Sequence, residues 1–201
     1  MTERAQAPRA GLRSLLDGMW PFRAAGGSAR RQAALLYRQL VAAARQPGFY
    51  AHLGVPDTPE GRFEMVALHV MLALRRLRDG GRAEQAVAQA LFDIMFADMD
   101  RALRELGIGD LSVGAYVKRM AQNLYARIAD LDRPLAEADR AAVVAVLRRN
   151  AYVGGSVPDD RVIGRLADYL IAAGKRLDGL GPDLVASGSE TGLTALAGTV
   201  E

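Results

Sequence analysis

The sequence of 201 residues contains no cysteine, only two histidines and only two lysines. The absence of cysteine excludes disulfides, thiolate zinc sites, cysteine nucleophiles and cysteine-ligated iron–sulfur clusters. Long apolar runs are also missing, because the longest, Met65 to Leu74, has ten residues and contains His69, whereas a membrane-spanning helix needs roughly 18 to 20. The N-terminus lacks the apolar region of a secretory signal, so the sequence predicts a cytoplasmic protein.

The positive charge is concentrated at the beginning of the chain. The formal net charge is +3, but residues 1–45 carry +6 and the remaining 156 residues carry −3. Residues 9–20 combine arginines, leucines at helical spacing and the only tryptophan. This amphipathic pattern favours a segment folded back on the domain, the alternative being contact with anionic lipid or another acidic surface. The expected membrane or ribosome contacts are Arg9, Leu12, Arg13, Leu16 and Trp20.

Apolar residues recur at helical spacing through most of the chain, and no alternating strand pattern accompanies them. Thr58 as N-cap and Pro59 as first helical residue give a clear helix start, and 131–134 (LDRP) is expected to end a helix. Helices are predicted over about residues 28–45, 59–78, 82–106, 110–130, 135–150 and 158–176. We therefore predict an all-α fold, a single compact bundle-like domain of six or seven helices over 29–178, with flexible extensions at 1–28 and 179–201.

Motifs of common catalytic and metal sites are missing from the sequence. The two histidines are 17 residues apart and no Glu-x-x-His pair accompanies them, so they do not match helical zinc or di-iron sites. The segment 107–112 (GIGDLS) begins like a dinucleotide fingerprint, but no strand precedes it and the third glycine is absent. We interpret it as the end of a helix, and we expect no enzymatic activity, no metal and no cofactor.

Two polar residues fall within apolar patterns. We interpret His69 as a core histidine with hydrogen-bond partners, the alternatives being a partner-facing or haem-related role. Asp98 lies on the edge of an apolar helix face and should need a partner, for which Arg101 is one candidate. Asp100 is expected to pair with Arg104 four residues later. A small-ligand carrier or an uncharacterised enzyme that uses His69 and Asp98 is therefore a second hypothesis for the function.

Arg75, Arg76 and Arg78 cluster at the end of the helix predicted over 59–78. Cations at this position are stabilised by the helix dipole. Alternatively, they form a basic surface for ribosomal RNA or anionic lipid together with the N-terminal arginines. RNA binding is thus a third, weaker hypothesis.

Several short strings, taken in order, resemble the ubiquinol-cytochrome c chaperone family. They are 49–50 (FY), 54–58 (GVPDT), 61–65 (GRFEM), 68–69 (LH), 98–100 (DMD), 103–107 (LRELG) and 149–152 (RNAY). The resemblance covers about residues 35–155. It implies an assembly factor for ubiquinol-cytochrome c reductase that acts on newly made cytochrome b rather than catalysing a reaction. Mitochondrial members of the family work with a partner protein and associate with the ribosome.

On this resemblance we expect a bacterial assembly chaperone that is cytoplasmic or peripheral to the inner membrane. The expected partners are cytochrome b or another subunit of the reductase, and the ribosome, but no DNA. The positions that the resemblance marks as partner-binding or fold-determining are Phe63, Leu68, His69, Asp98, Asp100, Arg104, Glu105, Asn150 and Tyr152.

Overall fold

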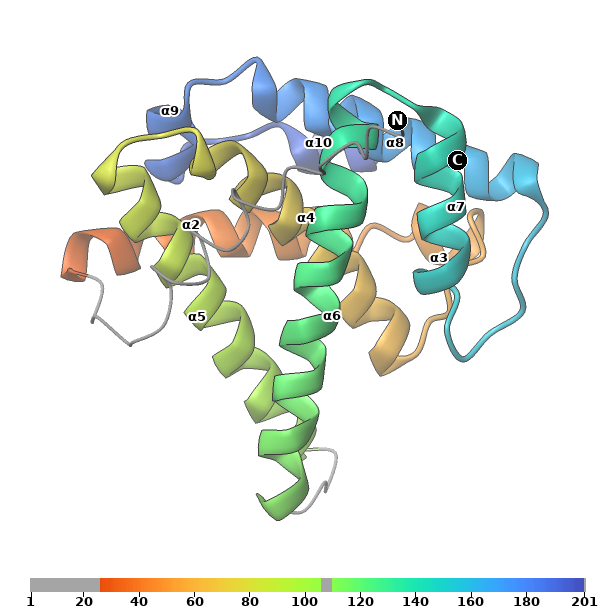
Figure 1. Ribbon diagram of the computed structural model, residues 1–201, viewed down its shortest axis with the longest axis horizontal. Helices are drawn as coiled ribbons and strands as arrows, with labels where there is room; N and C mark the ends of the chain where they lie inside the picture. Colours follow the sequence, from red (N-terminus) through yellow and green to blue (C-terminus); the bar gives the residue numbers. More distant parts are fainter. Residues whose placement is uncertain (1–25, 106–109, 201) are drawn as a thin grey trace, which may run out of the picture.

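The computed structural model describes residues 26–105 and 110–200, with side chains of α6 described from residue 122 onward. This part of the chain is helical and contains no strand, which confirms the predicted all-α class (Figure 1). Within the described ranges, six helices have eleven residues or more: α2 (Gly27–Ala44), α4 (Pro59–Arg78), α5 (Arg82–Glu105), α6 (Asp110–Ala136), α7 (Arg140–Asn150) and α8 (Asp160–Asp178). Three are short: α3 (Gly48–Ala51), α9 (Pro182–Ala186) and α10 (Leu193–Ala197).

Helix α4 is the central element of the core. It contacts α2, α5, α6, α8 and α9, and its buried residues cover nearly every side of the helix. Its first turn is fixed locally, because the Thr58 hydroxyl accepts a hydrogen bond from the Gly61 amide at 3.2 Å and Pro59 occupies the first helical position. The predicted bounds 59–78 are confirmed.

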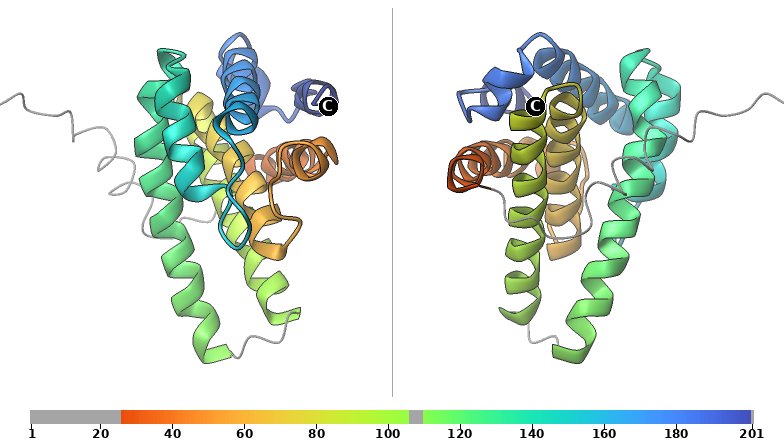
Figure 2. Two further views of the ribbon diagram at one scale, coloured as in Figure 1. Left: turned by 90° about the vertical axis from the view of Figure 1, so that its right-hand side faces the viewer. Right: turned by 60° about the vertical axis from the view of Figure 1, so that its left-hand side comes forward.

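Helices α5 and α6 run side by side, and the end of α5 and the beginning of α6 project from the rest of the molecule (Figures 1 and 2). An aromatic cluster connects the two helices closer to the core. The rings of Phe92 and Phe96 lie 4.5 Å apart, and Phe92 stacks on Tyr125 of α6 at 5.4 Å. The exposed end of α5 is therefore anchored at its base by aromatic packing.

The helix end predicted at 131–134 is wrong, because α6 continues through Pro134 to Ala136. Proline in a helix removes one backbone hydrogen bond, but Leu131 and Leu135 on either side of it are almost fully buried. Their burial holds the last turn in helical conformation. The next helix consequently begins at Arg140 rather than near 135, with the Asp139 side chain accepting from the Ala142 amide at 3.0 Å.

The expected flexible tail over 179–201 is also wrong for residues 179–200, which form α9, α10 and ordered turns. Leu193 is completely buried in the core, and the Gln39 side chain of α2 bonds to both Gly188 and Thr191. The glycines that indicated flexibility make tight turns instead, since Gly188 and Gly192 have φ values of 75° and 69°.

Candidate functional site

His69 lies in the middle of α4 with none of its surface exposed. Its Nδ1–H donates to the Met65 carbonyl at 2.7 Å, and the Tyr169 hydroxyl of α8 donates to its Nε2 at 2.6 Å. Burial lowers the pKa of His69 to about 4, so the ring is neutral at neutral pH, with the proton on Nδ1 and Nε2 as the acceptor. Phe49 of α3 packs edge-on against both rings. His69 therefore joins α3, α4 and α8, as the interpretation of a hydrogen-bonded core histidine expects.

Asp98 belongs to a separate group of contacts between α5 and α2. It pairs with Arg101, as predicted, and its Oδ2 accepts from the Tyr37 hydroxyl at 2.9 Å, a contact that the sequence did not predict. Burial and the negative charge of Asp98 raise the pKa of Tyr37. Because His69 has no access to solvent, it cannot share a ligand pocket with Asp98.

The end of α5 presents charged side chains to solvent. The predicted pair is confirmed, because Arg104 Nε lies 2.7 Å from Asp100 Oδ2, one turn apart. Glu105 is exposed at the last residue of the helix, and Asp98 retains about a third of its side-chain surface. Four of the positions marked by the resemblance are thus accessible on the projecting end of α5.

The other marked positions are in or against the core. Leu68 and Tyr152 are each 2% exposed, and Phe63 packs against the core while partly exposed. The Asn150 side chain donates to the Val146 carbonyl within α7 at 2.8 Å. The Tyr152 hydroxyl has no hydrogen-bond partner in the described part of the chain, and burial raises its pKa to about 12. These positions contribute to packing in the structure.

A buried ion pair joins Glu64 of α4 to Arg127 of α6, and the sequence analysis did not identify it. Glu64 is 4% exposed. Burial raises its pKa to about 7, although the positive charge of Arg127 acts in the opposite direction. The available signal was a carboxylate within a helix that is apolar on nearly every side, but the identity of its partner depends on how α6 packs.

The arginines at the end of α4 connect neighbouring elements. Arg75 and Arg78 both pair with Asp132 of α6, at 3.2 and 2.8 Å, and Arg75 also pairs with Asp178 at 3.1 Å. Arg76 donates to a backbone carbonyl between α8 and α9. The alternative of a free basic surface at these residues is therefore not supported.

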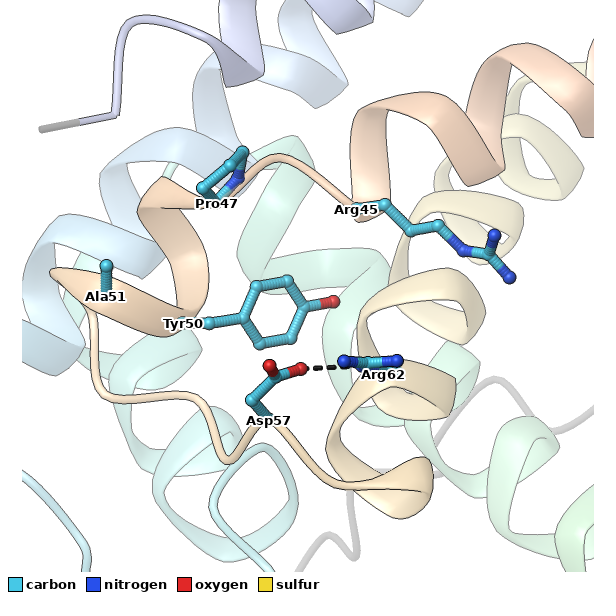
Figure 3. Close-up of a pocket in the computed structure, with 6 residues that line it drawn as sticks. All are labelled: Arg45, Pro47, Tyr50, Ala51, Asp57 and Arg62. Atoms are coloured by element: carbon cyan, nitrogen blue, oxygen red, sulfur yellow. Dashed lines mark hydrogen bonds and ion pairs between the residues drawn. The ribbon is translucent and has the colours of Figure 1, made fainter. Parts of the chain in front are cut away.

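A surface pocket of about 660 Å³ lies where α2, α3 and the beginning of α4 meet (Figure 3). Within it the Tyr50 hydroxyl donates to the Ala44 carbonyl at 2.8 Å, and Arg62 Nε donates to Asp57 at 2.6 Å. Because Arg62 is paired with Asp57, Arg45 is the guanidinium of this lining that remains to attract an anionic group. The lining residues are Arg45, Pro47, Tyr50, Ala51, Asp57 and Arg62.

The expected contacts at Arg9, Leu12, Arg13, Leu16 and Trp20 lie outside the described residues. In the described part of the chain, no group of three or more acidic or histidine side chains is arranged to hold a metal ion. None of the described helices combines the length and apolarity that crossing a bilayer requires.

A sequence profile of the ubiquinol-cytochrome C chaperone family matches residues 51–191, well over half of the chain. The chain belongs to this family. The match agrees with the resemblance found in the short strings and extends it through α8 and α9. Helix α2 and part of the pocket in Figure 3 precede the matched range.

Relatives of this chaperone family include ubiquinol-cytochrome-c reductase complex assembly factor 1 of Xenopus laevis, which is 28% identical over 141 residues, 70% of each chain. The Mus musculus and Homo sapiens proteins of that name are 25% and 24% identical over the same length. The match spans only 47% and 46% of those two proteins. Among solved structures, the crystal structure of the Cbp3 homolog from Brucella abortus has a TM-score of 0.72 and 36% identity, covering 80% of this chain and 88% of that one.

Proposed function

We propose that this chain is a non-catalytic assembly chaperone for ubiquinol-cytochrome c reductase that binds newly made cytochrome b. Membership of the chaperone family carries the proposal, because the curated relatives are named as assembly factors of that complex. The contacts of the buried polar residues support it. His69, Glu64 and Arg127 hold helices together, and His69 and Glu64 are almost inaccessible to a substrate.

We assign the client contact to the projecting end of α5. Asp98, Asp100, Arg104 and Glu105 lie there with accessible side chains. The apolar residues Met99 and Leu103 of the same segment are each only 8% exposed, so the surface that this segment offers to a client is mainly charged. Such a surface suits a client segment of complementary charge.

The chain acts in the cytoplasm at the periphery of the inner membrane, where a membrane-inserted client is made. The ribosome and a second assembly protein are further partners in this proposal, by analogy with mitochondrial family members. The alternative of a ligand carrier or enzyme using His69 and Asp98 gains no support, because both ring nitrogens of His69 are engaged within the core.

Deletion of the gene in the source organism tests the proposed function. We expect loss of the b-type cytochrome spectrum and of ubiquinol-cytochrome c reductase activity in membranes, with both restored by the intact gene. Unchanged cytochrome b and unchanged activity in the deletion strain would refute the assembly role.

Complementation with two matched variants tests the client surface. We expect Asp100→Ala/Arg104→Ala to rescue poorly at normal protein level. Arg133→Ala/Glu137→Ala removes a more exposed ion pair with the same spacing and should rescue fully. A photocrosslinking residue at Glu105 should capture cytochrome b. Equal rescue by both variants and no crosslink to cytochrome b would contradict the assignment.

A further inference from the structure

Helix α2 and its neighbours in the sequence carry positive charge and no acidic residue. Residues 18–56 contain no Asp or Glu. In the described part of this stretch, Arg30, Arg31, Arg38 and Arg45 form no ion pair with any described carboxylate. Arginines in α4, α5 and α6 pair with carboxylates of their own or neighbouring elements. The charge of α2 is therefore not neutralised within the described structure.

Three of these arginines form a line along one side of the helix. Arg31, Arg38 and Arg45 are exposed and seven residues apart, which places successive side chains about 10 Å apart on nearly the same side. Leu35 lies one turn after Arg31 and is 42% exposed. We call Arg31, Leu35, Arg38 and Arg45 the α2 arginine face.

The α2 arginine face is accessible from outside the molecule, since α2 lies at an outer edge of the structure in both views of Figure 2. Its last residue, Arg45, also lines the pocket in Figure 3, where Arg62 adds a second guanidinium paired with Asp57. Helix α9 packs against α2 and presents a further exposed aliphatic residue, Leu184, at 43%. Cationic and aliphatic groups thus occur together on this part of the surface.

We propose that the α2 arginine face binds the anionic surface of a lipid bilayer. Arginines attract acidic headgroups, and an exposed leucine among them can enter the interface between headgroups and acyl chains. Nucleic acid is the less favoured occupant, because the large exposed side chains here are leucines, which do not stack on bases. The inference rests on the proposed location at the inner membrane and names the surface responsible, which lies before the range matched by the family profile.

Co-sedimentation of the full chain with phosphatidylglycerol-containing vesicles, and with phosphatidylcholine vesicles as reference, tests the proposal. We expect binding only to the acidic vesicles, weakened by salt. Arg31→Gln/Arg38→Gln should reduce the partition coefficient about 30-fold, because each basic residue near such a surface contributes about a factor of five. Arg161→Gln/Arg165→Gln removes two exposed arginines of α8 that form no ion pair with a described residue, and it should leave the partition coefficient nearly unchanged. Equal binding by both variants would overturn the proposal.

A fluorescence measurement separates insertion of Leu35 from binding elsewhere in the chain. In a Trp20→Phe background, Leu35→Trp should show a blue shift with acidic vesicles, and an unshifted spectrum would contradict the proposal. Tighter binding to double-stranded RNA than to vesicles, lost in Arg31→Gln/Arg38→Gln, would reassign the face to nucleic acid. Vesicle binding needs no client, so its failure is distinguishable from failure of cytochrome b rescue.

Discussion

The hydrogen bond between His69 and Tyr169 makes a specific prediction about stability. Tyr169→Phe leaves the buried Nε2 of His69 without a donor, and His69→Leu leaves the buried hydroxyl of Tyr169 without an acceptor. Each single change should lower the free energy of unfolding by about 1–3 kcal/mol through the unpaired group. The double variant removes both groups together, so its loss should be smaller than the sum of the single losses by about 1 kcal/mol or more.

The same pair predicts how stability depends on pH. The pKa of His69 is about 4 in the folded protein, against an ordinary value of 6.5 that applies to the unfolded chain. On acidification the unfolded state therefore binds the proton first, so the folded state loses stability as pH falls from 6.5 towards 4. Between pH 7 and pH 5 the expected loss is about 2 kcal/mol. The contribution of Glu64 to the pH dependence of stability has the opposite sign, because its pKa is raised in the folded protein. Glu64 is present in every variant, so this contribution cancels when the variants are compared.

Urea unfolding followed by circular dichroism at pH 7, 6 and 5 measures both effects. The stability difference between the native sequence and His69→Leu/Tyr169→Phe should change by about 2 kcal/mol over this range, with unchanged denaturant slopes. A constant difference from pH 7 to pH 5 would show that His69 does not titrate as its burial requires. Additive single losses would show that the two side chains are not energetically coupled.

Three further predictions concern the core and its boundaries. Arg127→Met leaves Glu64 buried without a counter-charge, so it should lower the free energy of unfolding by about 3–5 kcal/mol at pH 8. The loss should be smaller below pH 7, where Glu64 is protonated. Urea unfolding at pH 8 and below pH 7 measures both losses, and equal losses would contradict the prediction. Leu193→Ala should lower the free energy of unfolding by about 2–5 kcal/mol in the same assay, because Leu193 is completely buried. Thr194→Ala should change it little, because Thr194 is exposed. Equal, small effects of the two substitutions would restore the interpretation of a flexible tail. Thr58→Ala should lose about 1 kcal/mol of stability in calorimetry, and an unchanged unfolding temperature would argue against its role as the cap of α4.

Local signals in the sequence accounted for features that depend on neighbouring residues. Thr58 and Pro59 determine the start of α4 by capping and by restricted backbone geometry, so the sequence predicted that boundary correctly. The pairs of Asp98 with Arg101 and Asp100 with Arg104 follow from helical spacing alone. Interactions of this kind are contained within a single helix.

Features that depend on packing between helices were not predictable in the same way. Pro134 normally ends a helix, but burial of the flanking leucines outweighs the lost hydrogen bond. Tyr37 and Asp98 are 61 residues apart, and the Glu64–Arg127 pair likewise joins two separate helices. Their partners follow only from the arrangement of α2, α4, α5 and α6, which no local pattern specifies.

The contacts of Gln39 impose an order on folding during synthesis. Its partners Gly188 and Thr191 are 149 and 152 residues later in the chain, and α10 packs along α2. Helix α2 leaves the ribosome long before these partners, so one flank of it has no covering until residues 188–197 have been made. Contacts of such high sequence separation slow folding, because a long loop must close before they form. These contacts therefore form only after residues 188–197 have left the ribosome, and nascent chains ending before residue 193 lack the packing of α10 on α2.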